Sequence, residues 1–123
     1  MKRSLFALGV VLAATAALTT AAFARHAATL KLVGTVGPGY TINLTVGGEK
    51  LVRLKAGTYS FVIHDRASIH AWSLDGPNGF AKDLTAVPFM GTKTVTVKLK
   101  AGKYKYYCPP HESMMFGHFT VVA

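Results

Sequence analysis

The sequence contains a single cysteine, Cys108, and few acidic residues. Its 123 residues include 14 lysines and arginines but only 5 aspartates and glutamates, so the formal net charge is +9. One cysteine cannot form a disulfide within its own chain. The thiol must be free, paired with another chain, or bound to a metal. A fold stabilised by internal disulfides is therefore excluded.

The sequence after the first 24 residues also lacks a helical hydrophobic stripe, an internal repeat and a long linker. Short runs of alternating apolar and polar residues are interrupted by glycine and proline, a pattern that indicates an all-β sandwich. The stretch 75–90 is the least regular, and we expect it to cover one edge of the sandwich. The predicted strands are 29–33, 40–46, 50–54, 59–64, 70–74, 93–99, 103–108 and 117–122.

The N-terminal segment has the features of a secretory signal peptide. Lys2 and Arg3 precede an apolar run over residues 5–18, and Ala22-Phe23-Ala24 offers a small-x-small cleavage site. We therefore expect a signal peptide over residues 1–24 and one domain over residues 25–123. The expected location is periplasmic or otherwise exported, without a permanent membrane anchor.

The excess of basic residues predicts an anionic partner. Loss of Lys2 and Arg3 takes the net charge from +9 to +7. Nucleic acid is the usual partner of a basic protein, but export makes that partner unsuitable. An acidic protein or an anionic surface is the better expectation. The alternative is that the excess charge only keeps a small domain soluble. Four lysines with outward parity around one predicted hairpin are candidates for steering such a partner: Lys98, Lys100, Lys103 and Lys105.

The residues around the cysteine form the most informative motif. Cys108 is followed by two prolines, His111 and Met115 in the spacing C-x2-H-x3-M-x-G-x-F. Thiolate, imidazole and a weak thioether suit copper that cycles between Cu(I) and Cu(II). Tyr104 and Tyr106 share the strand parity of Cys108, so the thiol is expected inside one end of the sandwich.

This motif resembles the ligand loop of the cupredoxins, the small blue-copper proteins such as plastocyanin and amicyanin. The resemblance extends from about Gly34 to Val122 and includes Gly57-Thr58-Tyr59, Asp65-x4-His70 and Gly102-x-Tyr104-x-Tyr106-x-Cys108. It implies a Greek-key β-sandwich of seven or eight strands. It also implies one type 1 copper ion, with His70, Cys108, His111 and Met115 as metal ligands.

Two of these ligands have competitors in the sequence. His64 competes with His70, but its parity is opposite to that of Phe61 and Ile63, which predicts a solvent-facing ring. Met114 competes with Met115, and only Met115 is followed by the x-Gly-x-Phe pattern of the family.

The residue after the first histidine departs from the family, which usually has asparagine where this chain has Ala71. The backbone N–H of Ala71 is still expected to reach the sulfur. Asp65 is expected to accept hydrogen bonds from amides of its own turn.

The resemblance implies a monomeric electron carrier with a redox partner protein, and neither an enzyme nor a binder of small-molecule substrates. Copper oxidases and nitrite reductases need a second copper site, and the sequence has no ligand pairs for one. The alternative function is copper storage, delivery or resistance, in which Met90 and Met114 would assist transfer.

Overall fold

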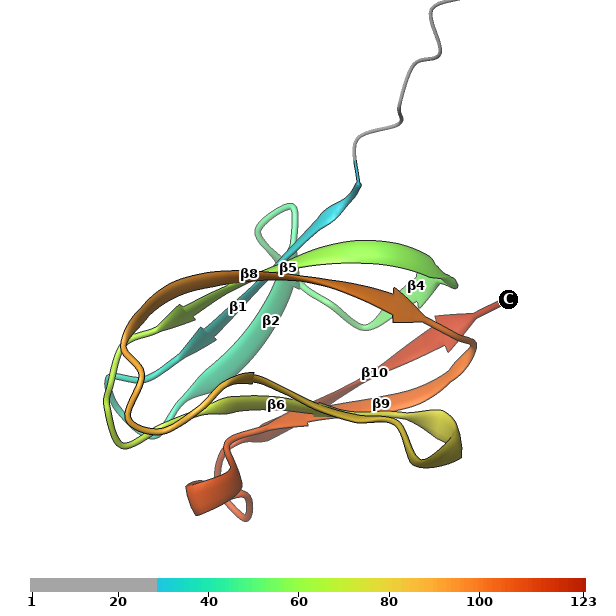
Figure 1. The fold of residues 1–123 in the computed structure, drawn as a ribbon. Coiled ribbons are helices and arrows are strands. Elements are labelled where there is room, and N and C mark those ends of the chain that lie inside the picture. Colours follow the sequence, from blue (N-terminus) through green and yellow to red (C-terminus); the bar gives the residue numbers. More distant parts are fainter. Residues whose placement is uncertain (1–28) are drawn as a thin grey trace, which may run out of the picture.

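The computed structural model describes residues 29–123, which form two facing β-sheets of five strands each (Figure 1). The predicted signal peptide and its cleavage site lie outside the described residues. The part of the chain that the structure describes contains no α-helix and no helix long and apolar enough to cross a membrane. The expected all-β sandwich is confirmed.

The ten strands are antiparallel to their neighbours except at two pairs, β1–β5 and β10–β4. In spatial order, the first sheet holds β3 (Glu49–Lys50), β2 (Ile42–Val46), β1 (Lys31–Val36), β5 (Gly57–Asp65) and β8 (Gly91–Leu99). The second holds β4 (Arg53–Lys55), β10 (Phe116–Val122), β9 (Gly102–Tyr107), β6 (Trp72–Asp75) and β7 (Ala81–Thr85). Two short 3-10 turns complete the fold: η1 (Pro77–Gly79) and η2 (Pro109–His111).

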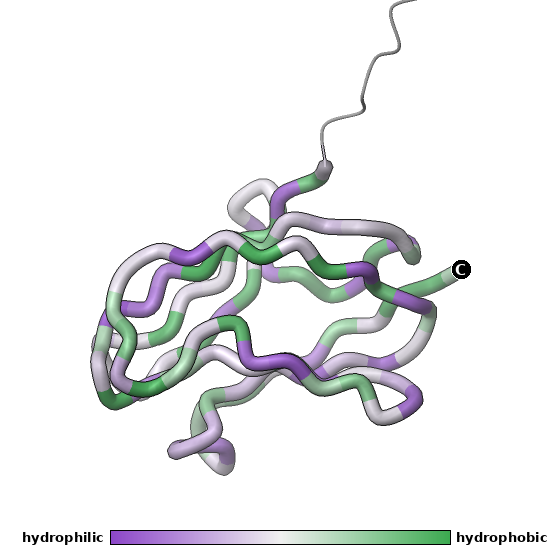
Figure 2. Tube along the Cα trace, in the orientation of Figure 1, coloured by the Kyte–Doolittle hydropathy of each residue, from purple (hydrophilic) through white to green (hydrophobic). Residues whose placement is uncertain are grey.

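Alternation along the strands fills the space between the sheets. Val97 and Leu99 are buried on β8 while Lys98 between them is exposed, and on β9 Tyr104 and Tyr106 are buried. Figure 2 shows hydrophobic and hydrophilic segments following one another along the chain trace of the sandwich. The predicted inward parity of the β9 tyrosines is confirmed, and it continues to Cys108.

Aromatic rings occupy much of the core next to this strand. The ring of Tyr106 stacks on Trp72 with centroids 5.4 Å apart, and Tyr104 stacks on Phe119 at 5.1 Å. Gly117 lies opposite Tyr106 in the β9–β10 register, and a Cβ at Gly117 would collide with the Tyr106 ring. The glycine in the M-x-G-x-F pattern is thus required by the tyrosine ring that covers it. Burial raises the pKa of Tyr106 above its usual range.

Several predicted segments differ from the observed strands. The predicted strand 70–74 begins only at Trp72, so His70 lies in the β5–β6 loop. The irregular stretch 75–90 contains β7, an edge strand of the second sheet that was missed because Lys82 and Asp83 are polar and exposed. The predicted strand 50–54 is divided between β3 and β4, which belong to different sheets. The predicted strand 40–46 begins only at Ile42, so Tyr40 lies in the β1–β2 loop.

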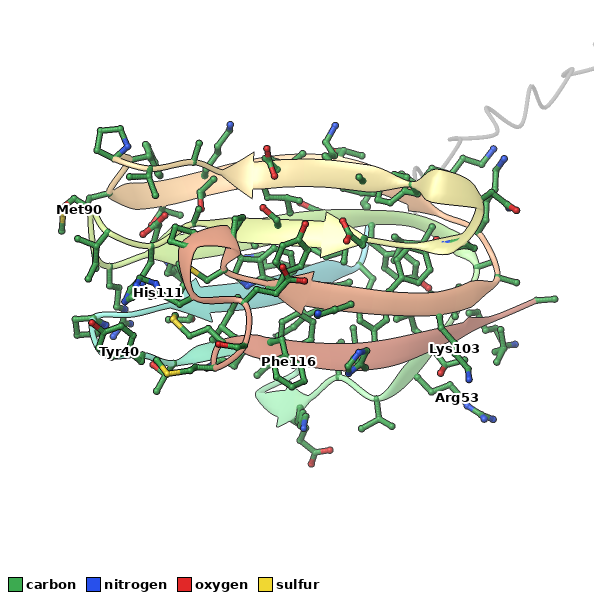
Figure 3. The ribbon with its side chains drawn as sticks, turned by 90° about the horizontal axis from the view of Figure 1, so that it is seen from below. Tyr40, Arg53, Met90, Lys103, His111 and Phe116 are labelled. Carbon is green, nitrogen blue, oxygen red and sulfur yellow. The ribbon has the colours of Figure 1, made fainter. Side chains whose placement is uncertain are left out.

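The loops at the two ends of the sandwich differ in charge. One end carries the β1–β2, β5–β6, β7–β8 and β9–β10 loops, and these four loops contain two charged residues, Arg66 and Glu112. The opposite end is basic and carries Arg53, Lys55, Lys98, Lys100 and Lys103. Figure 3 shows Tyr40, Met90 and His111 at the first end and Arg53 and Lys103 at the other.

Candidate metal centre

Cys108 follows β9 directly and is fully buried, with 0% of its surface exposed. Its backbone N–H donates to the carbonyl of Met115 at 3.0 Å, which closes the base of the β9–β10 loop. The thiol therefore emerges from a regular strand whose inward parity fixes its direction.

His111 ends the 3-10 turn η2, in which Pro109 and Pro110 set the backbone. Its N–H donates to the Cys108 carbonyl at 3.0 Å, and its own carbonyl accepts from the N–H groups of Met114 and Met115. The loop is thus a tight hydrogen-bonded turn. His111 is only half-buried, whereas Cys108 is buried.

His70 lies in the β5–β6 loop and is completely buried. The turn before it is closed by the His70 N–H donating to the Ala67 carbonyl at 3.1 Å. The Ala67 N–H donates to Asp65 Oδ1 at 3.3 Å, as expected for Asp65. Gly37 of the β1–β2 loop lies against the ring, because a Cβ there would be 2.9 Å from His70 Cδ2.

The side chains of His70, Cys108 and His111 converge on one point. The two Nδ1 atoms are 3.2 Å apart, and Cys108 Sγ lies 3.8 Å from His70 Nδ1 and 3.6 Å from His111 Nδ1. A point equidistant from the three atoms in their plane is about 2 Å from each, close to the roughly 2.0–2.3 Å of metal bonds to imidazole nitrogen and thiolate sulfur. The three residues therefore fit a metal ion.

The donor set selects copper among the metals that such a triangle can hold. Two imidazoles and one thiolate in a trigonal arrangement, with a weak axial thioether, are typical of blue-copper sites. Met115 is 1% exposed and belongs to the same core cluster as Cys108, whereas Met114 is 59% exposed. Of the two methionines, Met115 is therefore the one whose thioether lies in the interior with Cys108.

His64, the competitor of His70, lies outside this cluster. The metal-ligand group among the described residues contains His70, Cys108 and His111 but not His64. The His64 ring bonds to Thr92 Oγ1 at 3.0 Å on the outer face of the first sheet. His118 is exposed on β10 and is also outside the cluster.

Two buried polar atoms have no hydrogen-bond partner in the described part of the chain: Oδ2 of Asp65, the last residue of β5, and Nε2 of His70 in the β5–β6 loop. The Nδ1 of His70 faces Cys108, so the unpartnered Nε2 is the nitrogen directed away from the ligand atoms. This orientation leaves Nδ1 as the atom that can bind a metal.

Tyr40 is the neighbour of the centre that sequence reasoning missed. Its ring meets the His111 ring edge-on, with centroids 5.0 Å apart and planes at 84°, and the His70 ring at 5.6 Å and 71°. The Gly37-Pro38-Gly39 turn was a signal for a loop at this place. Nothing in the sequence indicated that the loop folds over the histidines.

The chain belongs to the family of copper-binding proteins described as the plastocyanin/azurin family, whose model matches residues 48–122. That match contains His70, Cys108, His111 and Met115, and the predicted membership in the blue-copper class is confirmed. No curated protein sequence matches the chain significantly.

Solved structures with the same fold include copper proteins. A crystal structure of rusticyanin aligns with a TM-score of 0.56 and 18% identity over 76% of this chain and 78% of that chain. Reduced rusticyanin, determined by NMR, aligns at 0.54 with 24% identity over 76% and 77%. A reduced Cu(I) form of an amicyanin variant aligns at 0.51 with 17% identity over 78% and 84%. At these identities the alignments show a shared fold.

Proposed function

We propose that the protein is an exported electron carrier with one type 1 copper ion. In this proposal His70, Cys108 and His111 would hold the copper, and the Met115 thioether would be a fourth, weaker donor. The observation that carries it is the convergence of two imidazole nitrogens and the only thiol on one point, with distances of 3.2, 3.6 and 3.8 Å between them.

The protein's contribution is to hold the ligands in place. When bound, the copper supplies a one-electron Cu(II)/Cu(I) couple. Cys108 is fixed by the end of β9, His70 by its closed turn and His111 by the η2 turn. Because these positions are set by backbone hydrogen bonds, little rearrangement accompanies a change of charge at the centre. His111 is the most exposed of the four proposed ligands, so its ring edge is the natural path for an electron to reach a partner.

Copper delivery is the alternative function, and the burial of the ligands argues against it. His70 and Cys108 are 0% exposed and Met115 is 1% exposed, so a copper ion there is enclosed on most sides. Exposed Met90 and Met114 are the features that would suit transfer. The test is to cycle the copper-loaded protein between oxidation states in the presence of a competing Cu(I) chelator. A carrier keeps its copper over many cycles, whereas a delivery protein loses Cu(I) within one.

The redox partner is proposed to dock at the end that holds His111. That end is apolar, with Met90, Met114 and Phe116 among its exposed side chains. Of the four lysines considered for steering, Lys105 bonds to Glu112 of the β9–β10 loop at 2.9 Å. The other three, Lys98, Lys100 and Lys103, lie at the opposite end of the sandwich, where Figure 3 labels Lys103. Their position does not favour an acidic partner at His111, and the acidic character of the partner stays a prediction.

A further inference from the structure

We propose that Tyr40 is a positioning residue of the copper centre, whose ring holds the His111 imidazole and keeps water from it. The inference rests on the proposed copper site and adds a residue from a third loop to it. Tyr40 comes from the β1–β2 loop, whereas His70 and His111 come from the β5–β6 and β9–β10 loops.

The ring geometry is that of a specific aromatic contact. The Tyr40 ring stands nearly perpendicular to both imidazoles, at 84° to His111 and 71° to His70, with centroid distances of 5.0 and 5.6 Å. Edge-to-face ring pairs with centroids about 4.5–7 Å apart are a favoured arrangement of aromatic rings. The two imidazoles are themselves edge-on at 5.0 Å and 79°. Three rings from three loops therefore form one mutually perpendicular cluster.

The cluster holds Tyr40 through its ring and not through its hydroxyl. In residues 29–123, side-chain hydrogen bonds are made by the hydroxyls of Tyr59, Tyr104 and Tyr107 but not by that of Tyr40. Tyr40 is 56% exposed, so one part of it faces solvent while another covers the histidines. Phenylalanine should therefore replace tyrosine here with little loss.

The loop that carries Tyr40 is itself built against His70. Gly37 is buried, has a left-handed φ of 73°, and lies so close to the His70 ring that a Cβ would be 2.9 Å from Cδ2. Its N–H donates to the Thr41 carbonyl at 2.9 Å, which closes the loop around Tyr40. The aromatic ring is thus presented by an ordered loop.

The consequence concerns the ligand that is easiest to lose. His111 is half-buried, and the η2 turn restrains its backbone but not the outer face of its ring. Tyr40 supplies that restraint and occupies space that water would otherwise fill. Loss of a residue that supports a metal ligand typically costs 10–100-fold in metal affinity. We therefore expect the Tyr40→Ala protein to release copper about tenfold faster or more.

The experiment compares Tyr40→Ala, Tyr40→Phe and Met90→Ala with the wild-type protein. Met90 is a matched control, because it is 58% exposed at the same end of the sandwich (Figure 3). Copper(II) loss to excess chelator is followed by the visible absorption of the full chain. In parallel, NMR of the copper-free proteins follows the ring protons of His111, which the Tyr40 ring current shifts.

The expected result is faster copper loss and moved His111 ring signals for Tyr40→Ala, with Tyr40→Phe and Met90→Ala like the wild type. Equal copper loss and unchanged His111 signals in Tyr40→Ala would overturn the inference. A Tyr40→Phe protein that loses copper as fast as Tyr40→Ala would also overturn it. So would a Met90→Ala protein that loses copper as fast as Tyr40→Ala. A wild-type protein that binds no copper would overturn the proposed function instead, while the copper-free NMR still tests the ring contact.

Discussion

The backbone N–H of Ala71 donates a hydrogen bond to the sulfur of Cys108, with N and Sγ 3.4 Å apart. In the described residues this is the one backbone donor that reaches the thiol. Pro109 and Pro110, which follow the cysteine, have no N–H to offer. Hydrogen bonds to a ligand sulfur withdraw electron density and tune the metal's potential. The link also joins the β5–β6 loop to the end of β9, and so ties two ligand loops together without the asparagine side chain usual in the family.

The two adjacent methionines should differ in their effect on the reduction potential. Met115→Leu removes a buried donor that favours Cu(II), so the potential should rise by about 59 mV for each tenfold loss of Cu(II) preference. The core should tolerate this swap of similar volume at a cost of less than about 1.5 kcal/mol. Met114→Leu, at an exposed position, should leave the potential unchanged. Voltammetry of both variants is the measurement, and a larger shift for Met114→Leu would move the proposed axial ligand by one residue.

Gly37→Ala should disturb His70 from the side opposite the metal. The left-handed φ of 73° costs an alanine about 1–2 kcal/mol. The new Cβ, 2.9 Å from His70 Cδ2, also forces the imidazole to move. We expect a lower free energy of unfolding and a shifted visible band after copper addition.

Gly39→Ala is the matched control in the same loop, because no atom lies within 4 Å of a Cβ at that position. Its stability should remain within about 0.5 kcal/mol of the wild type. Urea unfolding and absorption spectra of the two variants test whether they differ in stability and in the copper band. Equal behaviour would mean that the β1–β2 loop does not constrain His70.

Charge should influence electron transfer according to its distance from His111. β8 runs from the His111 end to the basic end, and its nine residues span about 27 Å at roughly 3.3 Å per residue. The Debye length is only about 10 Å at 0.1 M ionic strength. Arg66→Glu, at the His111 end, should therefore slow oxidation or reduction by a small anionic metal complex. Lys100→Glu should hardly change the rate.

The two substitutions change the net charge equally, so each is the control for the other. Stopped-flow rates at several salt concentrations separate location from net charge. An equal decrease in rate for both variants would show that the net charge of the whole molecule governs the reaction. The basic end could then act as a steering surface.

Periodicity and local motifs were sufficient to predict on which side of a strand a side chain lies, because that placement follows from the strand's own sequence. The parity of β9 placed Tyr104, Tyr106 and Cys108 on the inner face, and the parity of β5 placed His64 outside, because side chains alternate strictly along a strand. The M-x-G-x-F spacing, through its resemblance to the family's pattern, selected the buried methionine over the exposed one.

Contacts between loops far apart in the sequence were beyond such reasoning. Tyr40 and His111 are 71 positions apart, and their meeting depends on how the β1–β2 loop closes over the β5–β6 loop. The edge strand β7 was missed because Lys82 and Asp83 interrupt its hydrophobic alternation. The hairpin lysines were correctly expected to face outward, but parity does not indicate at which end of the sandwich they lie.

The central claim is that His70, Cys108, His111 and Met115 form one type 1 copper site, and a visible spectrum during copper titration tests it most directly. The wild-type protein should reach an intense blue or green thiolate-to-copper band at one equivalent of Cu(II). Cys108→Ser should give no such band, with unchanged far-ultraviolet circular dichroism showing that the sandwich is folded. A wild-type protein that binds copper without colour, or a Cys108→Ser protein that keeps the band, would contradict the account.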